Sequence, residues 1–229
     1  MCYSIESSAK TTFLSLTAIA VLLRSNVPHF KWIGAILIGW CGMQFAELLL
    51  WLTNPRKSCT SMNKLITLTL IPFIILLQPI GAILGSFFVK PWSDCSQPRK
   101  LTIVGYAATV SFIMLFAFYF YTDPQKSYCT TVSPNGHLNW WLNFKSEKSM
   151  DYIRIYYLWF FASFLPLLAL WNVSYKAIVA ITIIPLAAFF IGLRTDSSAS
   201  IWCHYTSFTS VVALTLYGLY KFNIYNILK

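Results

Sequence analysis

Long runs of apolar residues, separated by short segments rich in charged residues, Pro, Asn and Asp, dominate the chain. A membrane-spanning helix needs about 20 mostly apolar residues, because the hydrocarbon core of a bilayer is about 30 Å thick. The pattern predicts a single all-α domain over 1–229, an integral membrane bundle of seven transmembrane helices. The predicted spans lie at about 8–24, 31–53, 64–89, 101–121, 152–171, 174–193 and 200–221.

Three segments depart from a simple apolar run. Ser and Thr dilute the first span, and Pro72 and Pro79 in the third span are expected to kink its helix. The one long connection, at about 122–151, mixes turn residues with aromatic residues. That mixture predicts an ordered loop that lies against the membrane surface.

The composition agrees with a membrane protein. Only 10% of the residues are charged, against about 25% in soluble domains, and 57% are hydrophobic. The net charge of +10 comes from Lys and Arg scattered at the ends of the predicted spans. The lipid bilayer is therefore the predicted partner, and nucleic acid is not. The composition leaves open whether the chain forms a homo-oligomer.

The Lys and Arg residues do not decide the orientation, because nine fall on the N-terminal side of the predicted bundle and eight on the other. Acidic residues are less even, since five of the seven lie on the N-terminal side and only Asp94 on the other. This imbalance favours an N-terminus outside and a cytoplasmic C-terminus.

Two cysteines, Cys59 and Cys129, fall in predicted loops on the N-terminal side. If that side faces an oxidising compartment, the two can form a disulfide. Two unpaired thiols in a reducing compartment are an equally good interpretation.

Glu47 is the one carboxylate well inside a predicted span. Trp40, Gln44, Glu47 and Trp51 share one helix face by the 3.6-residue period, and we expect that face to point into the bundle. Ionisable residues within a span are costly and often functional. Glu47 and Gln44 are therefore predicted to bind a ligand or to handle ions. A protonated or hydrogen-bonded acid that ties helices together is the alternative.

The last predicted span begins on the same side of the membrane as Glu47. Its start holds Trp202, Cys203 and His204, and the topology brings Cys2 to the same leaflet. Cys203, Ser207 and Ser210 share a face of that helix, where small polar residues are expected to pack against other helices. Thiolates and an imidazole suit Zn or Cu, but no metal-ligand spacing accompanies them. We predict no metal and no cofactor.

Several classes of seven-helix protein are excluded. A retinal pigment needs a Lys in the middle of the last helix, and this helix has only Lys221 at its end. The Asp-Arg-Tyr and Asn-Pro-x-x-Tyr motifs of G-protein-coupled receptors are missing. Intramembrane hydrolases with several His ligands do not fit a chain with one His in a span. The sequence favours a protein that is not an enzyme, without excluding one.

Three short motifs carry a resemblance. They are Met1-Cys2-Tyr3-Ser4, Gln44-Phe45-Ala46-Glu47 and Trp202-Cys203. The chain resembles an uncharacterised family of polytopic membrane proteins that begin Met-Cys-Phe-Ser, carry Gln/His-x-x-Glu in the second helix and end with Trp-Cys in the last. The resemblance implies seven helices and a common site at Cys2, Glu47 and Trp202-Cys203. Tyr3, Leu48 and His204-Tyr205 depart from the pattern, and the resemblance implies no activity.

The sequence thus predicts a multi-pass membrane protein with a role in transport, as a channel or as a sensor. Glu47 is the expected titrating or cation-binding group, and a small ion or small molecule is the expected ligand. One alternative is an intramembrane enzyme or a redox or metal protein that uses Cys2, Cys203 and His204. Another is a structural or assembly protein.

Overall fold

The computed structural model describes residues 4–120, 129–134, 136–139 and 198–222, together with positions 183, 187 and 191. The described chain is mostly helical and all-α. In chain order the long helices are α1 (Ile5–Leu23), α2 (Pro28–Leu52), α4 (Ile71–Val89), α5 (Gln97–Phe120) and α8 (Ser198–Lys221). Short elements are α3 (Ser61–Leu65), the π-helical turn Ile66–Leu70, the 3₁₀ turn Trp92–Asp94, β1 (Thr131–Val132) and β2 (Leu138–Asn139).

Five of the seven predicted helices are confirmed as helices, with ends within a few residues of those expected. The other two, at 152–171 and 174–193, lie outside the described residues. Two of the described helical segments are long and apolar enough to cross a membrane, Pro28–Leu52 and Ser61–Val89, with mean hydropathies of 1.7 and 2.1. Seven spans are therefore not shown.

The segment with the two prolines, Ser61–Val89, is continuously helical and has a π-helical turn near its start. The π-helical turn Ile66–Leu70 ends two residues before Pro72, and Pro79 lies inside α4. A proline has no N–H and its ring crowds the carbonyl four residues earlier. A π-helical turn, which bonds i to i+5, relaxes that crowding without ending the helix.

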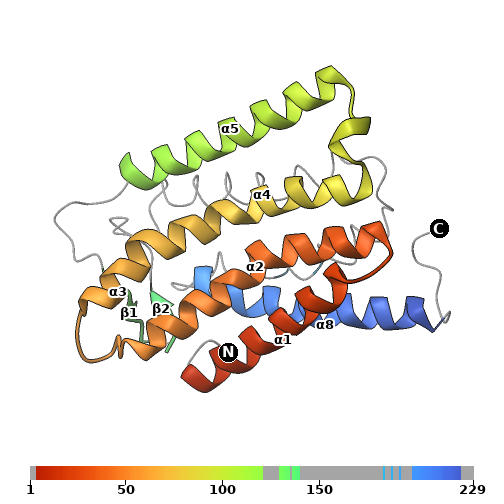
Figure 1. Ribbon diagram of the computed structural model, residues 1–229. Coiled ribbons are helices and arrows are strands. Elements are labelled where there is room, and N and C mark those ends of the chain that lie inside the picture. The colour runs from red at the N-terminus through yellow and green to blue at the C-terminus, as the bar shows by residue number, and fades with distance from the viewer. Residues whose placement is uncertain are drawn as a thin grey trace.

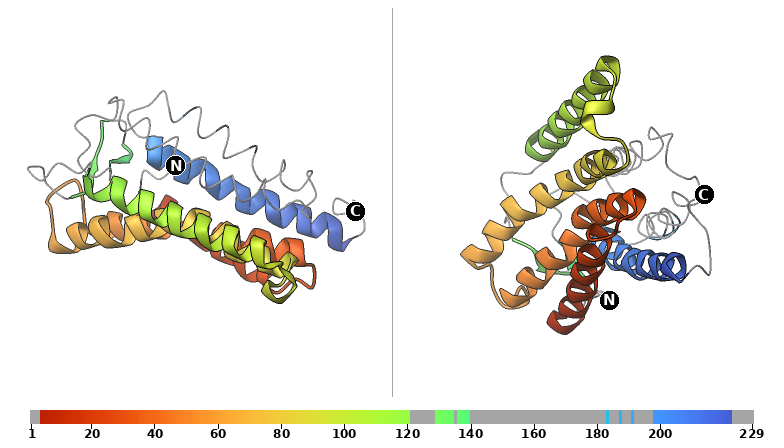
Figure 2. Two further views of the ribbon diagram at one scale, coloured as in Figure 1. Left: turned by 90° about the horizontal axis from the view of Figure 1, so that it is seen from above. Right: turned by 45° about the vertical axis from the view of Figure 1, so that its right-hand side comes forward.

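Helix α2 is the centre of the bundle. It packs against α1, α4 and α8, while α5 packs on the far side of α4. Figure 1 shows α5, α4 and α2 in succession, with α1 and α8 beyond α2, and the turned view on the right of Figure 2 shows the same order. Most of α2 is buried, from Phe30 to Trp51, and its exposed large hydrophobic residues, Ile38, Phe45 and Leu52, form one stripe at a spacing of seven residues. The other faces of α2 form the core of the fold.

Glycines allow α2 and α4 to approach closely. A Cβ added at Gly39 would lie 2.6 Å from the carbonyl oxygen of Leu77, and one at Gly85 would lie 2.7 Å from Cβ of Ala35. Ala35 and Gly39 are one turn apart on α2, as Gly81 and Gly85 are on α4. Small residues at this spacing let helix backbones meet in membrane bundles. The indole Nε1 of Trp32 donates to the carbonyl of Ala82 across the same contact, at 3.1 Å.

We expect Gly39→Ala to lower the free energy of unfolding by about 1–3 kcal/mol, because the new methyl group forces two backbones apart. Thermal unfolding in detergent measures the effect. Gly105→Ala in α5 is the matched control, since no described atom lies within 4 Å of its added Cβ. The control should leave stability unchanged or raise it by up to about 1 kcal/mol. Equal losses in both variants would contradict close packing of α2 and α4.

Candidate functional site

The face of α2 that was predicted to point into the bundle is buried. Trp40, Gln44 and Glu47 have no exposed surface, and Trp51 is 7% exposed. The prediction for this face is confirmed. Glu47 is the one buried carboxylate among the described residues. Burying a charge is costly unless polar groups surround it, so the neighbours of this face decide what Glu47 can do.

Gln44 joins three helices at one level. The Thr11 hydroxyl of α1 donates to Oε1 of Gln44 at 3.0 Å. The Nε2 group of Gln44 donates to the backbone carbonyl of Cys203 in α8. Gln44 and Cys203 were predicted to lie in one leaflet, and the structure brings them into contact.

A second polar contact lies deeper in the bundle, about one turn from Gln44. Sγ of Cys41 lies 3.2 Å from Oγ of Ser210, and the Ser210 hydroxyl donates to Oγ of Ser15 at 3.3 Å. These groups again come from α2, α8 and α1. The predicted polar face of α8 is also confirmed to be buried, since Cys203, Ser207 and Ser210 are at most 3% exposed.

The buried polar residues between these three helices form a band that we call the polar seam. It comprises Ser8, Thr12, Ser15 and the half-buried Thr11 of α1, Cys41, Gln44 and Glu47 of α2, and Cys203, Ser207 and Ser210 of α8. The hydroxyls of Ser8 and Thr12 are buried and have no hydrogen-bond partner among the described residues. Buried hydroxyls of this kind usually bind water or ligand atoms.

An open pocket lies at the N-terminal-side end of α1 and α2. It has a volume of about 540 Å³ and is lined by Ser4, Ile5, Glu6, Trp51, Leu52, Asn54, Pro55 and Arg56. The Arg56 guanidinium stacks over the Trp51 ring, 5.5 Å from its centre. Lys10 lies 2.6 Å from Glu6, and its hydrogen bond and charge lower the pKa of that carboxyl group. Trp51 is one turn from Glu47 along α2, so the pocket is at the outer end of the seam.

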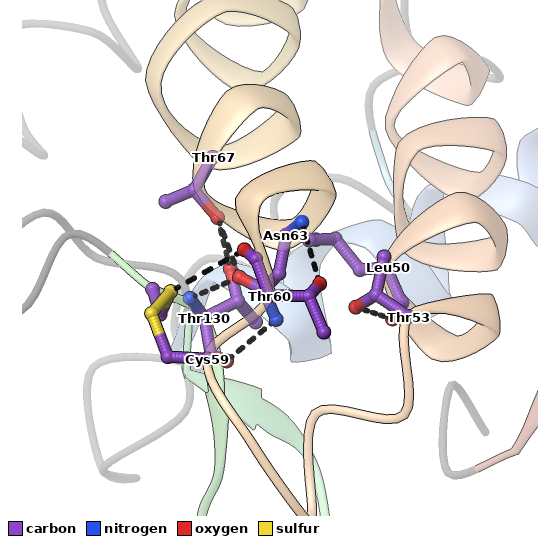
Figure 3. Close-up of a disulfide and its surroundings, with 8 residues drawn as sticks. Leu50, Thr53, Cys59, Thr60, Asn63, Thr67 and Thr130 are labelled. Atoms are coloured by element: carbon purple, nitrogen blue, oxygen red, sulfur yellow. Dashed lines mark hydrogen bonds between the residues drawn. A yellow bond between two sulfur atoms is a disulfide. The ribbon is translucent and has the colours of Figure 1, made fainter.

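A disulfide joins Cys59 and Cys129, the pairing that the sequence left open, with their Cα atoms 5.7 Å apart. Figure 3 shows it next to a cluster of hydrogen bonds at the start of α3. Asn63 donates through Nδ2 to the Thr130 carbonyl at 3.0 Å and accepts from the Thr130 N–H at 2.8 Å. The Thr67 and Thr130 hydroxyls are 2.8 Å apart. Residues 129–130 are thus held near the start of α3 by the disulfide and by two hydrogen bonds between the Asn63 side chain and the Thr130 backbone.

Some predicted site residues are not placed. Cys2 lies outside the described residues. The backbones of Trp202 and His204 belong to α8, but their side chains are outside the described part. Within the described ranges, no group of three or more His, Cys, Asp or Glu residues could hold a metal ion.

The contribution of α1 has a signal in the sequence that differs from simple dilution of an apolar span. Ser8, Thr12 and Ser15 recur at i, i+4 and i+7, which puts them on one helix face. Cys41, a further unpredicted member, precedes Gln44 by three residues on the same side of α2. The Asn63 and Thr130 pair had no sequence signal, because the contact depends on how two loops fold together.

Comparison with known proteins gives no relative, since no protein-family model, curated protein or solved structure matches the chain.

His137, in the turn between β1 and β2, provides a pH test of this end of the molecule. Burial lowers the pKa of His137 from 6.5 to about 4. The unfolded segment therefore binds more protons than the folded one between those values. The free energy of unfolding is therefore highest above about pH 6.5. It falls as the pH approaches 4, by up to about 3 kcal/mol.

Hydrogen–deuterium exchange of residues 129–139 between pH 7 and pH 4.5, corrected for intrinsic rates, measures this loss. His137→Gln has no titrating imidazole and should show a flat profile. If lowering the pH reduces the protection from exchange in both proteins, groups other than His137 cause the loss.

Proposed function

We propose that the chain is a multi-pass membrane protein that transports or senses protons or small cations, with Glu47 as the titrating or cation-binding group. The observation that carries the proposal is a fully buried carboxyl group on the α2 face that also holds Gln44, whose side chain hydrogen-bonds to α1 and α8. A carboxyl group within a span that faces polar side chains is the usual element of an ion or proton path. The expected seven helices and the bilayer as partner belong to the same proposal.

Two features support a path that is reached from the N-terminal side. The pocket lined by Trp51 and Arg56 lies one turn beyond Glu47. Ser8 and Thr12, which have no partner among the described residues, can hydrogen-bond to water between the helices. Protons move along such hydrogen-bonded groups, whereas purely apolar packing would stop them.

Flux through reconstituted liposomes tests the role of Glu47. We expect wild-type protein to dissipate an imposed proton or cation gradient, and Glu47→Gln to reduce the rate at least tenfold while its thermal stability stays close to wild type. The amide keeps the shape of the side chain but cannot release a proton. Asp94→Asn makes the same chemical change at an exposed site outside the long helices and should leave the flux unchanged. An unaltered flux in Glu47→Gln would exclude the proposed role.

A packing role is the second candidate, and Gln44 favours it. Its two hydrogen bonds join α1, α2 and α8 in the way that buried amides hold membrane helices together. If Glu47 has only a packing role, Glu47→Gln changes the thermal stability and leaves the flux unchanged. The same experiment therefore separates the two candidates. The intramembrane redox or metal role of Cys2, Cys203 and His204 has no support among the described contacts.

The disulfide also supports the proposed orientation, with the N-terminus outside. A bond between Cys59 and Cys129 persists in an oxidising compartment and is rare in a reducing one. The α2–α3 connection and residues 129–139 would then face outward, and the α4–α5 connection would face the cytoplasm.

Labelling of intact cells checks this orientation. After treatment with a membrane-impermeant reductant, a bulky impermeant maleimide should modify Cys59 and Cys129 without permeabilisation. A cysteine introduced by Lys90→Cys, before the α4–α5 connection, should react only after the membrane is permeabilised. The opposite order of labelling would reverse the topology.

A further inference from the structure

The described residues 129–134 and 136–139 form a small folded unit within the predicted long connection at 122–151. In β1 and β2, Thr131 pairs with Asn139 and Val132 with Leu138. The turn is closed by the Ser133 N–H and hydroxyl, which both donate to the His137 carbonyl at 2.8 Å. Gly136 takes a φ of 83°, in the left-handed region that glycine enters without strain. The hairpin is therefore a defined structure and not a free linker.

The hairpin packs against the end of the bundle where the polar seam begins. Leu138 is 1% exposed and belongs to the same buried cluster as Leu50, Trp51 and Cys203. Strand β2 contacts α8, and Figure 1 shows the hairpin beside α3 and the end of α2. Leu138 is thus buried on the strand that contacts α8. Cys203 accepts the hydrogen bond from Gln44 at that same level.

Two independent attachments keep the hairpin in this place. The Cys59–Cys129 disulfide ties its first residue to the segment before α3. Asn63 makes its two hydrogen bonds with the backbone of Thr130, as Figure 3 shows. Both attachments are on the β1 side of the hairpin, whereas Leu138 lies on β2, where it pairs with Val132. Among the described contacts, β1 is therefore the anchored strand, and β2 is held by its pairing with β1 and by packing against α8.

We propose that residues 129–139 are a cap on the polar seam, anchored by the disulfide and Asn63, and that the strand with Leu138 must move before water or an ion reaches Glu47. The inference rests on the proposed function of the seam and names the device that controls access to it. Its physical basis is that a buried leucine excludes water from the polar groups behind it.

The buried thiol of Cys203 is a natural reporter of the cap. We compare the rate of its modification by N-ethylmaleimide in wild-type protein and in Cys59→Ser/Cys129→Ser/Asn63→Asp, using mass spectrometry in detergent. Removing both anchors should raise the rate at Cys203 at least tenfold. Cys41 is also buried and free, but it lies deeper in the seam against Ser210. Its rate should stay at the wild-type value.

A matched control separates opening of the cap from general loosening. Trp32→Phe removes a buried hydrogen bond between α2 and α4, away from the hairpin. It should leave the rate at Cys203 unchanged. An unchanged rate in the anchor variant, a parallel rise at Cys41, or an equal rise in Trp32→Phe would each overturn the proposal.

Wild-type protein offers a second measurement if the anchor variant does not fold. The slow modification of Cys203 should follow the opening of the hairpin, measured by hydrogen exchange at the amides of Val132 and Leu138. Reaction at Cys203 while those amides remain protected would overturn the cap. Neither labelling experiment depends on flux. If Glu47→Gln leaves the flux unaltered and the cap result stands, the proposed function fails and the cap covers a structural seam.

Discussion

The close approach of α2 to α4 is the constraint on which the rest of the bundle depends. Gly39 and Gly85 leave no space for a side chain between the two backbones. In a bilayer, helices gain little from hydrophobic association, because lipid is as apolar as the helix surface. Close van der Waals contact and hydrogen bonds such as that from Trp32 to Ala82 supply the stability instead. This contact fixes one face of α2 and leaves its other faces for α1 and α8.

The polar seam follows from the central position of α2. On its buried faces, α2 has to satisfy its polar side chains with its neighbours, because water does not reach them. Gln44 and Cys41 are satisfied by Thr11, Ser210 and the Cys203 carbonyl. The hydroxyls that do this are also the residues that make α1 and α8 less apolar. The lower hydropathy of these two helices and the seam therefore have one cause, which is the polar face that each turns toward α2.

The sequence was informative where the signal is local. Apolar runs predicted the helices, and the 3.6-residue period predicted that the faces with Glu47 and Cys203 are buried. It could not predict which faces meet, because that depends on the rotation and spacing of helices far apart in the chain. Gln44 and Cys203 are 159 residues apart, and Cys59 and Cys129 are 70 apart. The glycine pair at 81 and 85 was a usable signal for the α2–α4 contact, whereas the docking of Thr130 on Asn63 was not.

The two ends of the seam differ, and this difference bears on the proposed role in transport or sensing. Toward the C-terminal side, the last polar contact is between Ser15, Cys41 and Ser210. Beyond it the same three helices meet through Ala18, Leu22 and Ala213, with Phe30 packed edge-on to Tyr217 at 5.1 Å. Among the described residues, a proton or ion at Glu47 therefore meets an apolar layer between α1, α2 and α8. This layer closes the route between these three helices toward the C-terminal side. Transport along this route would require α1 or α8 to move, whereas a sensor that is read from the N-terminal side would require no such movement.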